Sequence, residues 1–217
     1  VRNGYVPPGK SYHGFEAPYA WRVERMDTCF GQFIDRLKRL RLYDRSLVVL
    51  TADHGELIGE DGRWGHSYHM FPEGIQIPLL VRVPAAAHAR HLDRGGVSLS
   101  TDITPTLYSA LGYRPARSND LMGVSLLEST DHVSTIRRRE SYVLSASYGA
   151  VYAVVSRNGR RLYLADAIKG GDQAYRRGVD GAWDAIEVDS GTRTVGQMQI
   201  RRYIDQISRI YHLEQRF

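Results

Sequence analysis

The feature that most constrains this chain is an apolar run that ends abruptly in polar residues. Residues 47–50 read Leu-Val-Val-Leu, and residues 51–57 continue as Thr-Ala-Asp-His-Gly-Glu-Leu. A short, β-branched apolar run is typical of a strand buried on both faces of a parallel sheet. Ligands of open α/β sheets bind just outside the carboxyl ends of such strands. Asp53 and His54 are therefore candidate metal ligands, although taken alone they also fit a strand-end turn in which Asp53 caps the next segment.

The sequence on either side of this motif predicts a helix and a second strand. From residue 18 to about residue 42, apolar side chains recur every three or four positions, which predicts an amphipathic helix with a wide buried stripe. Residues 77–83 predict another buried strand. Between the strands, residues 55–75 are rich in glycine and show no clear period, which predicts a long functional loop carrying His66 and His69.

The sequence after residue 97 predicts one more helix and then a series of short strands. The cluster Ser100-Thr101-Asp102 predicts a capped helix that runs to Leu111 and stops at Gly112. Short strands are predicted after about residue 141, at 142–146, 151–156, 161–165 and 183–188. Asn158-Gly159 predicts a type I′ hairpin between two of them.

A last helix, from about residue 195 to 213, should cover that sheet with its apolar side chains, namely Met198, Tyr203, Ile204, Ile207, Ile210 and Tyr211. The predicted domains are an α/β part at 1–140 and a small α+β part at 141–217.

Composition excludes several classes of function. The 217 residues carry a net charge of +5, but the basic residues are scattered and no aromatic-interleaved stripe exists, which disfavours nucleic-acid binding. The single cysteine, Cys29, excludes an internal disulfide and a multi-thiolate metal site, and its place in a helix pattern predicts a small buried residue. The chain begins at Val1 without a methionine, so we expect further sequence upstream.

Four blocks in order resemble the second half of the catalytic domain of the sulfatase family, in the alkaline phosphatase superfamily. They are Leu42-Tyr43-Asp44-Arg45-Ser46 through Asp53-His54-Gly55-Glu56, Gly59 to His66, Ile77 to Val81, and Ser100 to Leu107. Residues 183–189 resemble the end of the family's small C-terminal sheet. The resemblance implies an α/β fold with part of a mostly parallel sheet flanked by helices, followed by a small antiparallel sheet with a C-terminal helix.

The same resemblance implies a metal centre. Asp53 and His54 match two residues that bind a divalent cation at the family's reaction site. With oxygen-rich ligands from upstream we expect Ca²⁺, whereas a site richer in imidazole would favour Zn²⁺ or Mn²⁺. Glu56 is interpreted either as a residue that orients a ligand or as a plain surface carboxylate.

His66 departs from the sulfatase pattern, because many sulfatases place a lysine there to contact the sulfate. A histidine at this position resembles several phosphotransferases and sulfatase-like hydrolases of the superfamily. An imidazole can bind a second metal ion, donate a hydrogen bond to the anion or protonate a leaving oxygen. We expect His66 to be catalytic and to contact substrate, and consider Arg63 as a second substrate contact. His69 is a weaker candidate.

The nucleophile of the family has no match here. Neither Cys-x-Pro-x-Arg nor Ser-x-Pro-x-Arg occurs, so a formylglycine, if used, would lie outside this chain. The sequence therefore predicts part of a metal-dependent hydrolase of small anionic sulfate esters, inactive as an isolated chain. A missing N-terminal half, a partner chain or a dimer mate would complete it. Phosphoester hydrolysis or phosphoryl transfer and a non-catalytic sulfatase-like domain are the alternatives, and an extracytoplasmic location is expected by analogy alone.

Overall fold

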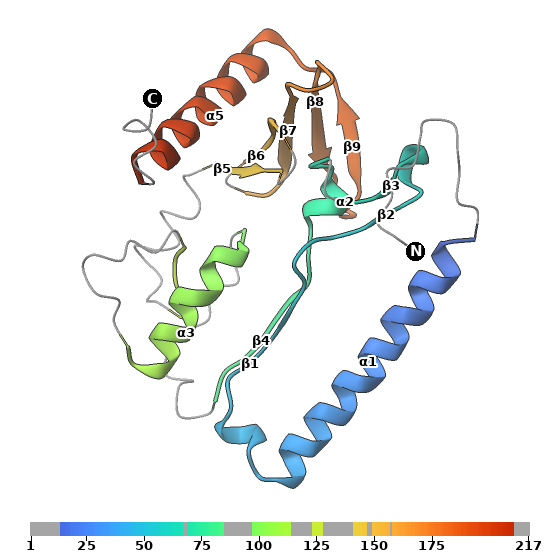
Figure 1. The fold of residues 1–217 in the computed structure, drawn as a ribbon, viewed down its shortest axis with the longest axis vertical. Helices are drawn as coiled ribbons and strands as arrows, with labels where there is room; N and C mark the ends of the chain where they lie inside the picture. Colours follow the sequence, from blue (N-terminus) through green and yellow to red (C-terminus); the bar gives the residue numbers. More distant parts are fainter. Residues whose placement is uncertain are drawn as a thin grey trace. The chain divides into compact units, whose positions relative to one another are not determined.

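The computed structural model describes residues 14–66, 69–84, 97–113, 123–127, 141–146, 149–156 and 158–210. They belong to two compact units (Figure 1), one from Val1–His66, Gln76–Asp93 and Ser98–Thr130, the other from Ser67–Ile75, Arg94–Val97 and Asp131–Phe217. Residues 128–140 lie outside the described part, so the domain boundary at 140 stays a prediction. None of the helices within the described ranges combines the length and apolar character that crossing a bilayer requires.

Among the described residues, the first unit contains two longer helices and four short strands. In chain order its elements are α1 (Glu16–Arg39), η1 (Tyr43–Arg45), β1 (Val48–Thr51), β2 (Leu57–Ile58), η2 (Glu60–Gly62), β3 (Trp64–Gly65), β4 (Leu79–Arg82), η4 (Ser100–Asp102) and α3 (Ile103–Leu111). The two predicted strands are thus present at β1 and β4. As predicted, α3 ends at Gly112, which adopts the left-handed conformation with φ 76° that glycine tolerates.

The pairing of β1 with β4 corrects one expectation. The two strands run antiparallel, with Val48 opposite Arg82 and Thr51 opposite Leu79. A parallel pair would need a crossover, usually a helix, whereas the described residues between these strands form only a short hairpin and the four-residue α2 (Pro72–Ile75). All strand pairs within the described residues are antiparallel. The expected parallel sheet is therefore not seen in this part of the chain.

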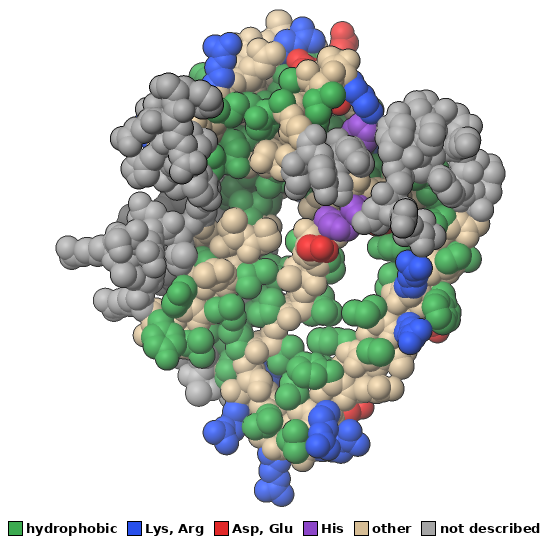
Figure 2. All heavy atoms as spheres, in the orientation of Figure 1, with side chains coloured by type: hydrophobic (Ala, Val, Ile, Leu, Met, Phe, Trp, Pro, Cys, Tyr) green, Lys and Arg blue, Asp and Glu red, His purple; other side chains and the backbone are tan. Residues whose placement is uncertain are grey.

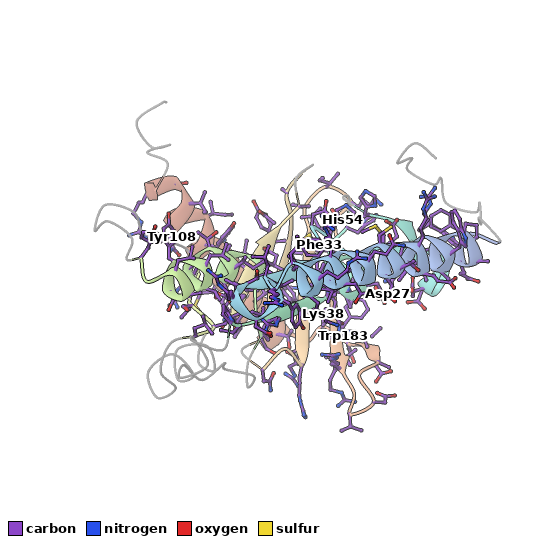
Figure 3. All side chains as sticks on the ribbon, turned by 90° about the horizontal axis from the view of Figure 1, so that it is seen from below. Asp27, Phe33, Lys38, His54, Tyr108 and Trp183 are labelled. Atoms are coloured by element: carbon purple, nitrogen blue, oxygen red, sulfur yellow. The ribbon has the colours of Figure 1, made fainter. Side chains whose placement is uncertain are left out.

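The apolar stripe of α1 is present but uncovered, contrary to the buried stripe that its period predicts. No residue of α1 is buried by the described part of the chain. Side chains stand off the helix all round in Figure 3, which labels Asp27, Phe33 and Lys38, and hydrophobic side chains form much of the surface over α1 in Figure 2. Phe33 is 51% exposed and Met26 65% exposed. Cys29 is exposed as well, so its expected burial is also wrong.

Asp102 holds a loop rather than capping α3 with its side chain. The carboxylate of this buried residue accepts hydrogen bonds from the backbone N–H groups of Leu99 at 3.0 Å and Val124 at 2.8 Å. Thr106 continues the connection, since its Oγ1 donates to the Asp102 carbonyl and accepts from the Leu126 N–H at 2.9 Å. Two polar side chains thereby tie residues 123–127 to η4 and α3, and satisfy backbone groups that burial would otherwise leave unpaired.

The second unit is built around a five-stranded antiparallel sheet in sequential order. Its strands are β5 (Tyr142–Ser145), β6 (Val151–Val155), β7 (Arg161–Asp166), β8 (Asp172–Arg177) and β9 (Trp183–Ile186). β8 was not predicted, because only Ala174 and Tyr175 interrupt its polar sequence. The turn between β7 and β8 does have a sequence signature. Asp166 Oδ1 accepts hydrogen bonds from the N–H groups of Ile168 and Lys169, just before Gly170-Gly171.

One helix, α5 (Ser190–Ile210), packs on a face of this sheet. Ile200 of α5 forms a buried cluster with Val154 and Tyr163. Gly196 lies against the Tyr163 ring so closely that an added Cβ would sit 2.3 Å from a ring carbon. The sequence predicted this helix and part of its inward face: Tyr203 and Ile207 are half-buried, whereas Met198 and Ile204 are 43% and 40% exposed. The side chains of Ile210 and Tyr211, also predicted to face inward, are not among those that the structure describes.

Candidate metal and active site

Asp53 and His54 follow directly after β1, where the strand ends and the backbone is free to turn. Asp53 Oδ1 accepts the backbone N–H of His54 at 3.0 Å, and Asp53 Oδ2 lies 3.7 Å from His54 Nε2. The Asp53 side chain is 88% exposed and that of His54 is 41% exposed. The two side chains therefore converge at the end of the strand and remain accessible to a ligand.

The protonation of the His54 ring follows from its neighbour. His54 Nδ1 lies 2.8 Å from the carbonyl oxygen of Gly55. A carbonyl oxygen can only accept a hydrogen bond, so Nδ1 carries the proton and donates it. In the neutral ring Nε2 then presents a lone pair, which is the form that binds a metal ion. Two donors that bind one ion at about 2.1 Å each lie at most about 4.2 Å apart. The separation between Asp53 Oδ2 and His54 Nε2 fits that limit.

A small hairpin returns the chain to His54. β2 and β3 pair so that Leu57 lies opposite Gly65, and the residues just outside that pair are Glu56 and His66. The turn depends on Gly59, whose φ is 134° and whose Cβ position would lie 3.2 Å from the Trp64 ring. Glu60 Oε2 supports the turn by accepting the Ile58 N–H at 2.7 Å. The predicted functional loop is thus an ordered hairpin up to His66.

Glu56 and His66 form a hydrogen-bonded pair at the open end of this hairpin. His66 Nδ1 lies 2.9 Å from Glu56 Oε2, and the two side chains are 13% and 19% exposed. An ionised carboxylate can only accept, so in the pair His66 Nδ1 donates. From the sequence alone, a plain surface position for Glu56 was an equally good interpretation. The β2–β3 register places Glu56 opposite His66, and the glycines of residues 59–65 were the sequence signal for that hairpin.

The hairpin also brings His66 against His54. Their rings stack with centroids 3.9 Å apart and planes inclined by 24°. His54, Glu56 and His66 each offer a ligand atom, and these three atoms lie within 4.8 Å of one another. Residues twelve positions apart in sequence thus meet in one cluster that contains two imidazoles and a carboxylate, of which His54 is exposed and the other two are half-buried.

The remaining candidates lie in other surroundings. Arg63 directs its guanidinium to Asp61 Oδ2 at 3.0 Å and to the Glu60 carbonyl oxygen at 3.1 Å. These contacts hold Arg63 within its own turn. His69 belongs to the second unit, where its Nε2 lies 3.2 Å from Lys169 Nζ and its ring lies 5.1 Å from the Phe71 ring.

Comparisons with known proteins agree with the motifs of the first unit. Residues 10–113 match the family model described as Sulfatase. The choline-sulfatase of Rhizobium meliloti (strain 1021) is 31% identical over 159 residues, which are 67% of this chain and 28% of that protein. The low-salt glycan biosynthesis sulfotransferase of Haloferax volcanii is 37% identical over 94 residues, covering 42% of this chain and 23% of that protein.

This chain also resembles a solved structure in its fold. The phosphonate monoester hydrolase from Silicibacter pomeroyi has a TM-score of 0.58 and 22% sequence identity, over 84% of this chain and 38% of that one. At such low identity the likeness is one of fold. The chain spans about a quarter of the length of the two curated relatives.

Proposed function

Because residues 10–113 place this chain in the sulfatase family, we propose that it forms part of a metal-dependent sulfate ester hydrolase. Asp53 and His54 hold the divalent cation in this proposal. The observation that carries it is the 3.7 Å separation of Asp53 Oδ2 and His54 Nε2 at the end of β1. The hydrogen bond from His54 Nδ1 to Gly55, which leaves Nε2 free to bind, supports the same assignment.

In this proposal, different residues of the chain bind the metal ion and contact the substrate. A bound cation polarises the sulfuryl group and stabilises a nearby nucleophile. Asp53 and His54 fix its position from the end of a strand, and His66 lies against His54 where it can contact the ester. Loss of the His66 side chain should lower turnover by about a hundredfold, the scale of a well-placed catalytic group. Arg63 has a smaller share, because Asp61 and the Glu60 carbonyl already bind its guanidinium.

The nucleophile, in this proposal, comes from outside the 217 residues. No Cys-x-Pro-x-Arg or Ser-x-Pro-x-Arg sequence occurs in the chain, and Cys29 lies on the exposed surface of α1. Two protein ligands also fall short of the six or more donors that Ca²⁺ takes. The isolated chain should therefore be inactive, and the full-length protein, with its additional ligands and nucleophile, is the species to assay.

A second candidate is hydrolysis of phosphate or phosphonate esters on the same scaffold. The specific observation is His66, which stands where the sulfatase pattern carries a lysine. The shared fold with a phosphonate monoester hydrolase is compatible with it. A doubly charged phosphate ester and a singly charged sulfate ester differ in how much positive charge the site must supply.

The test is a direct comparison of leaving-group-matched substrates. The full-length protein is assayed with 4-nitrophenyl sulfate, 4-nitrophenyl phosphate and a 4-nitrophenyl phosphonate monoester, as wild type and as His66→Ala. We expect the highest kcat/KM for the sulfate and a loss of about a hundredfold in His66→Ala. A preference for phosphate or phosphonate would replace the leading proposal by the second. Wild-type kinetics in His66→Ala would remove His66 from the reaction site.

A further inference from the structure

We propose that His69 and Lys169 of the second unit form a binding site for an oxyanion, either a sulfate or a carboxylate group. Lys169 contacts the anion through its ammonium group, and His69 is a positioning residue that holds the ammonium in place. The site uses none of the residues proposed to bind the metal ion. Inorganic sulfate and an acidic substituent of the ester substrate are two sources of such an anion, and only the second source rests on the proposed function.

The first observation is the contact between the two side chains. They come from segments 100 residues apart in the sequence and meet within one unit, where His69 Nε2 lies 3.2 Å from Lys169 Nζ. An ammonium group can only donate hydrogen bonds, so the imidazole accepts through the Nε2 lone pair and is neutral in this contact. The bond uses one of the three N–H donors of the ammonium and restricts a side chain that is otherwise flexible.

The second observation is that no carboxylate neutralises Lys169 within the described ranges. None of the ion pairs that join described residues includes it. The two nearest acidic residues in the sequence bind elsewhere. Asp166 Oδ1 accepts the backbone N–H of Lys169 at 2.9 Å, and Asp172 Oδ2 accepts a hydrogen bond from Arg193 Nε at 2.7 Å. Lys169 is exposed, so its ammonium is accessible to an anion, with which it can form charge-assisted hydrogen bonds.

The turn that carries Lys169 is fixed by its neighbours. The Ala167 N–H donates to the Ala150 carbonyl oxygen at 3.0 Å, which ties the β7–β8 turn to the β5–β6 turn. The Ile168 side chain covers Gly149 so closely that a Cβ added there would clash with it. A backbone hydrogen bond and side-chain packing therefore set the point from which Lys169 extends.

His69 is held by aromatic packing. Its ring lies 5.1 Å from the ring of Phe71, which is 8% exposed and meets the Tyr175 ring edge-on at 6.2 Å. Tyr175 belongs to β8, the strand that follows the turn carrying Lys169. Both members of the pair are thus anchored to the same sheet before a ligand arrives. Such preorganisation lowers the entropic cost of binding.

The chemistry of the pair indicates the class of ligand. An ammonium group acts as a compact point charge without the planar fork of arginine, so it accepts both the tetrahedral sulfate and the planar carboxylate. His69 follows His66, the residue proposed to contact the ester, by three residues in the sequence. An acidic substituent of that ester is therefore one source of the anion. Free sulfate, a product of the proposed reaction, is the other.

The first measurement detects an anion at Lys169 without turnover. Full-length protein is acetylated in the presence of sodium sulfate, sodium benzoate or sodium chloride at equal ionic strength, and peptide mass spectrometry follows each lysine. Lys38 is the matched control, because it is an exposed lysine of the first unit that pairs with Asp35 at 3.8 Å. We expect sulfate or benzoate, at twice its dissociation constant, to slow acetylation of Lys169 about threefold relative to chloride, and to leave Lys38 unchanged.

Variants of His69 test its positioning role. His69→Ala removes the acceptor of the Lys169 hydrogen bond and should raise the anion concentration for half-protection by about threefold to fivefold. His69→Gln should restore most of the protection, because a side-chain amide oxygen also accepts from an ammonium group. Equal protection in the wild type and in folded His69→Ala would remove His69 from the site.

The second measurement identifies the source of the anion. KM and kcat are compared for 4-nitrophenyl sulfate and for the same ester with a carboxylate on its ring, in the wild type, Lys169→Gln and Lys38→Gln. An acidic substituent as the ligand predicts that Lys169→Gln raises KM for the carboxylated ester by about fivefold and leaves its kcat and the unsubstituted ester unchanged. Protection by sulfate with an unchanged KM for both esters assigns the site to inorganic sulfate.

The protection of Lys169 decides the inference. If neither sulfate nor benzoate protects Lys169, or if both lysines are protected equally, the inference is overturned. Selective protection of Lys169 by sulfate in a protein that hydrolyses no sulfate ester would support the oxyanion site and reject the proposed function.

Discussion

The two long helices of the chain look alike in sequence and differ in what they contact. α1 and α5 are both amphipathic, and each carries a glycine in its interior, Gly31 and Gly196. Gly196 lies against the Tyr163 ring, and Ile200 is 7% exposed beside it. Gly31 has no neighbour within 4 Å of its Cβ position among the described residues, and no residue of α1 is buried by them.

This difference shows what an apolar stripe can and cannot establish. The stripe establishes that a helix has a face to bury, whereas the surface that covers it is a property of the whole structure. α5 finds its cover in strands of the same unit. The described part of the chain supplies no such cover for α1, which agrees with our proposal that the active enzyme contains more than these 217 residues. Exposed apolar surface of this extent generally marks an interaction surface.

The largest expected loss of stability comes from removing a buried leucine side chain in the sheet of the second unit. Leu162 of β7 is 1% exposed, whereas Leu80 of β4 is 55% exposed. Leu162→Ala leaves a cavity in a closed core and should lower the free energy of unfolding by about 2–5 kcal/mol. Urea denaturation followed by circular dichroism measures it, with Leu80→Ala as the matched strand control. Equal losses in the two variants would mean that both strands are buried alike in solution.

The next largest change in stability is expected from substituting the glycine in the interior of α5. Gly196→Ala places a Cβ 2.3 Å from a Tyr163 ring carbon. The helix or the ring must then shift, and overpacking of this kind costs about 1–3 kcal/mol. That cost exceeds the gain of about 1 kcal/mol that alanine brings to a helix interior. We expect a net loss of stability in thermal and urea unfolding. A stabilised variant would show that α5 is not held against the sheet.

The same substitution in α1 should have the opposite sign. Gly31→Ala meets open space, so only the helix propensity changes, and the gain is about 0.5–1 kcal/mol. The helical signal of the variant should persist to higher urea concentration than that of the wild type. A loss of more than about 1 kcal/mol would instead reveal that another surface packs against Gly31 in solution, for example a second copy of the chain.

The smallest effect is a dependence of stability on alkaline pH. Burial raises the pKa of the Tyr163 hydroxyl to about 12, with the neighbouring Asp172 carboxylate adding to the increase. An unfolded tyrosine has a pKa of about 10. Below about pH 10 both states keep the proton, so stability does not change. Between about pH 10 and 12 the unfolded chain loses the proton first, so stability falls as the pH rises.

The measurement for Tyr163 is urea unfolding at several pH values between 8 and about 11.5, for the wild type and for Tyr163→Phe. The variant lacks the ionising group and should lose less stability over the same range. Identical slopes would place the Tyr163 hydroxyl in contact with solvent.

The sequence predicted the elements that depend on local signals. The strands at β1 and β4, the end of α3 at Gly112 and four of the five strands of the second unit follow from apolar runs and turn residues. β8 was missed, since its neighbours and not its own sequence make it a strand. The antiparallel pairing of β1 with β4 and the exposure of α1 were also missed, because both depend on which surfaces meet.

In the candidate site, too, local sequence predicted the residues involved but not the contacts between them. Asp53, His54 and His66 were recognisable from residue type and motif. The pairing of Glu56 with His66 was not, since it follows from the register of a two-residue hairpin. The ion pair between Arg63 and Asp61 likewise depends on a turn in which Asp61 adopts φ 49°, a left-handed conformation that aspartate adopts more often than most residues but that was not predicted here.

The most direct test of the proposed reaction site is metal-dependent turnover at the end of β1. Full-length protein, stripped of metal, is assayed with an aryl sulfate while Ca²⁺, Mn²⁺ or Zn²⁺ is added back, as wild type, Asp53→Ala and His54→Ala. We predict that metal restores turnover in the wild type and that either substitution lowers it by about a hundredfold or more at saturating substrate. Turnover that needs no added metal, or that survives both substitutions unchanged, would contradict the assignment of Asp53 and His54 as the metal ligands of this enzyme.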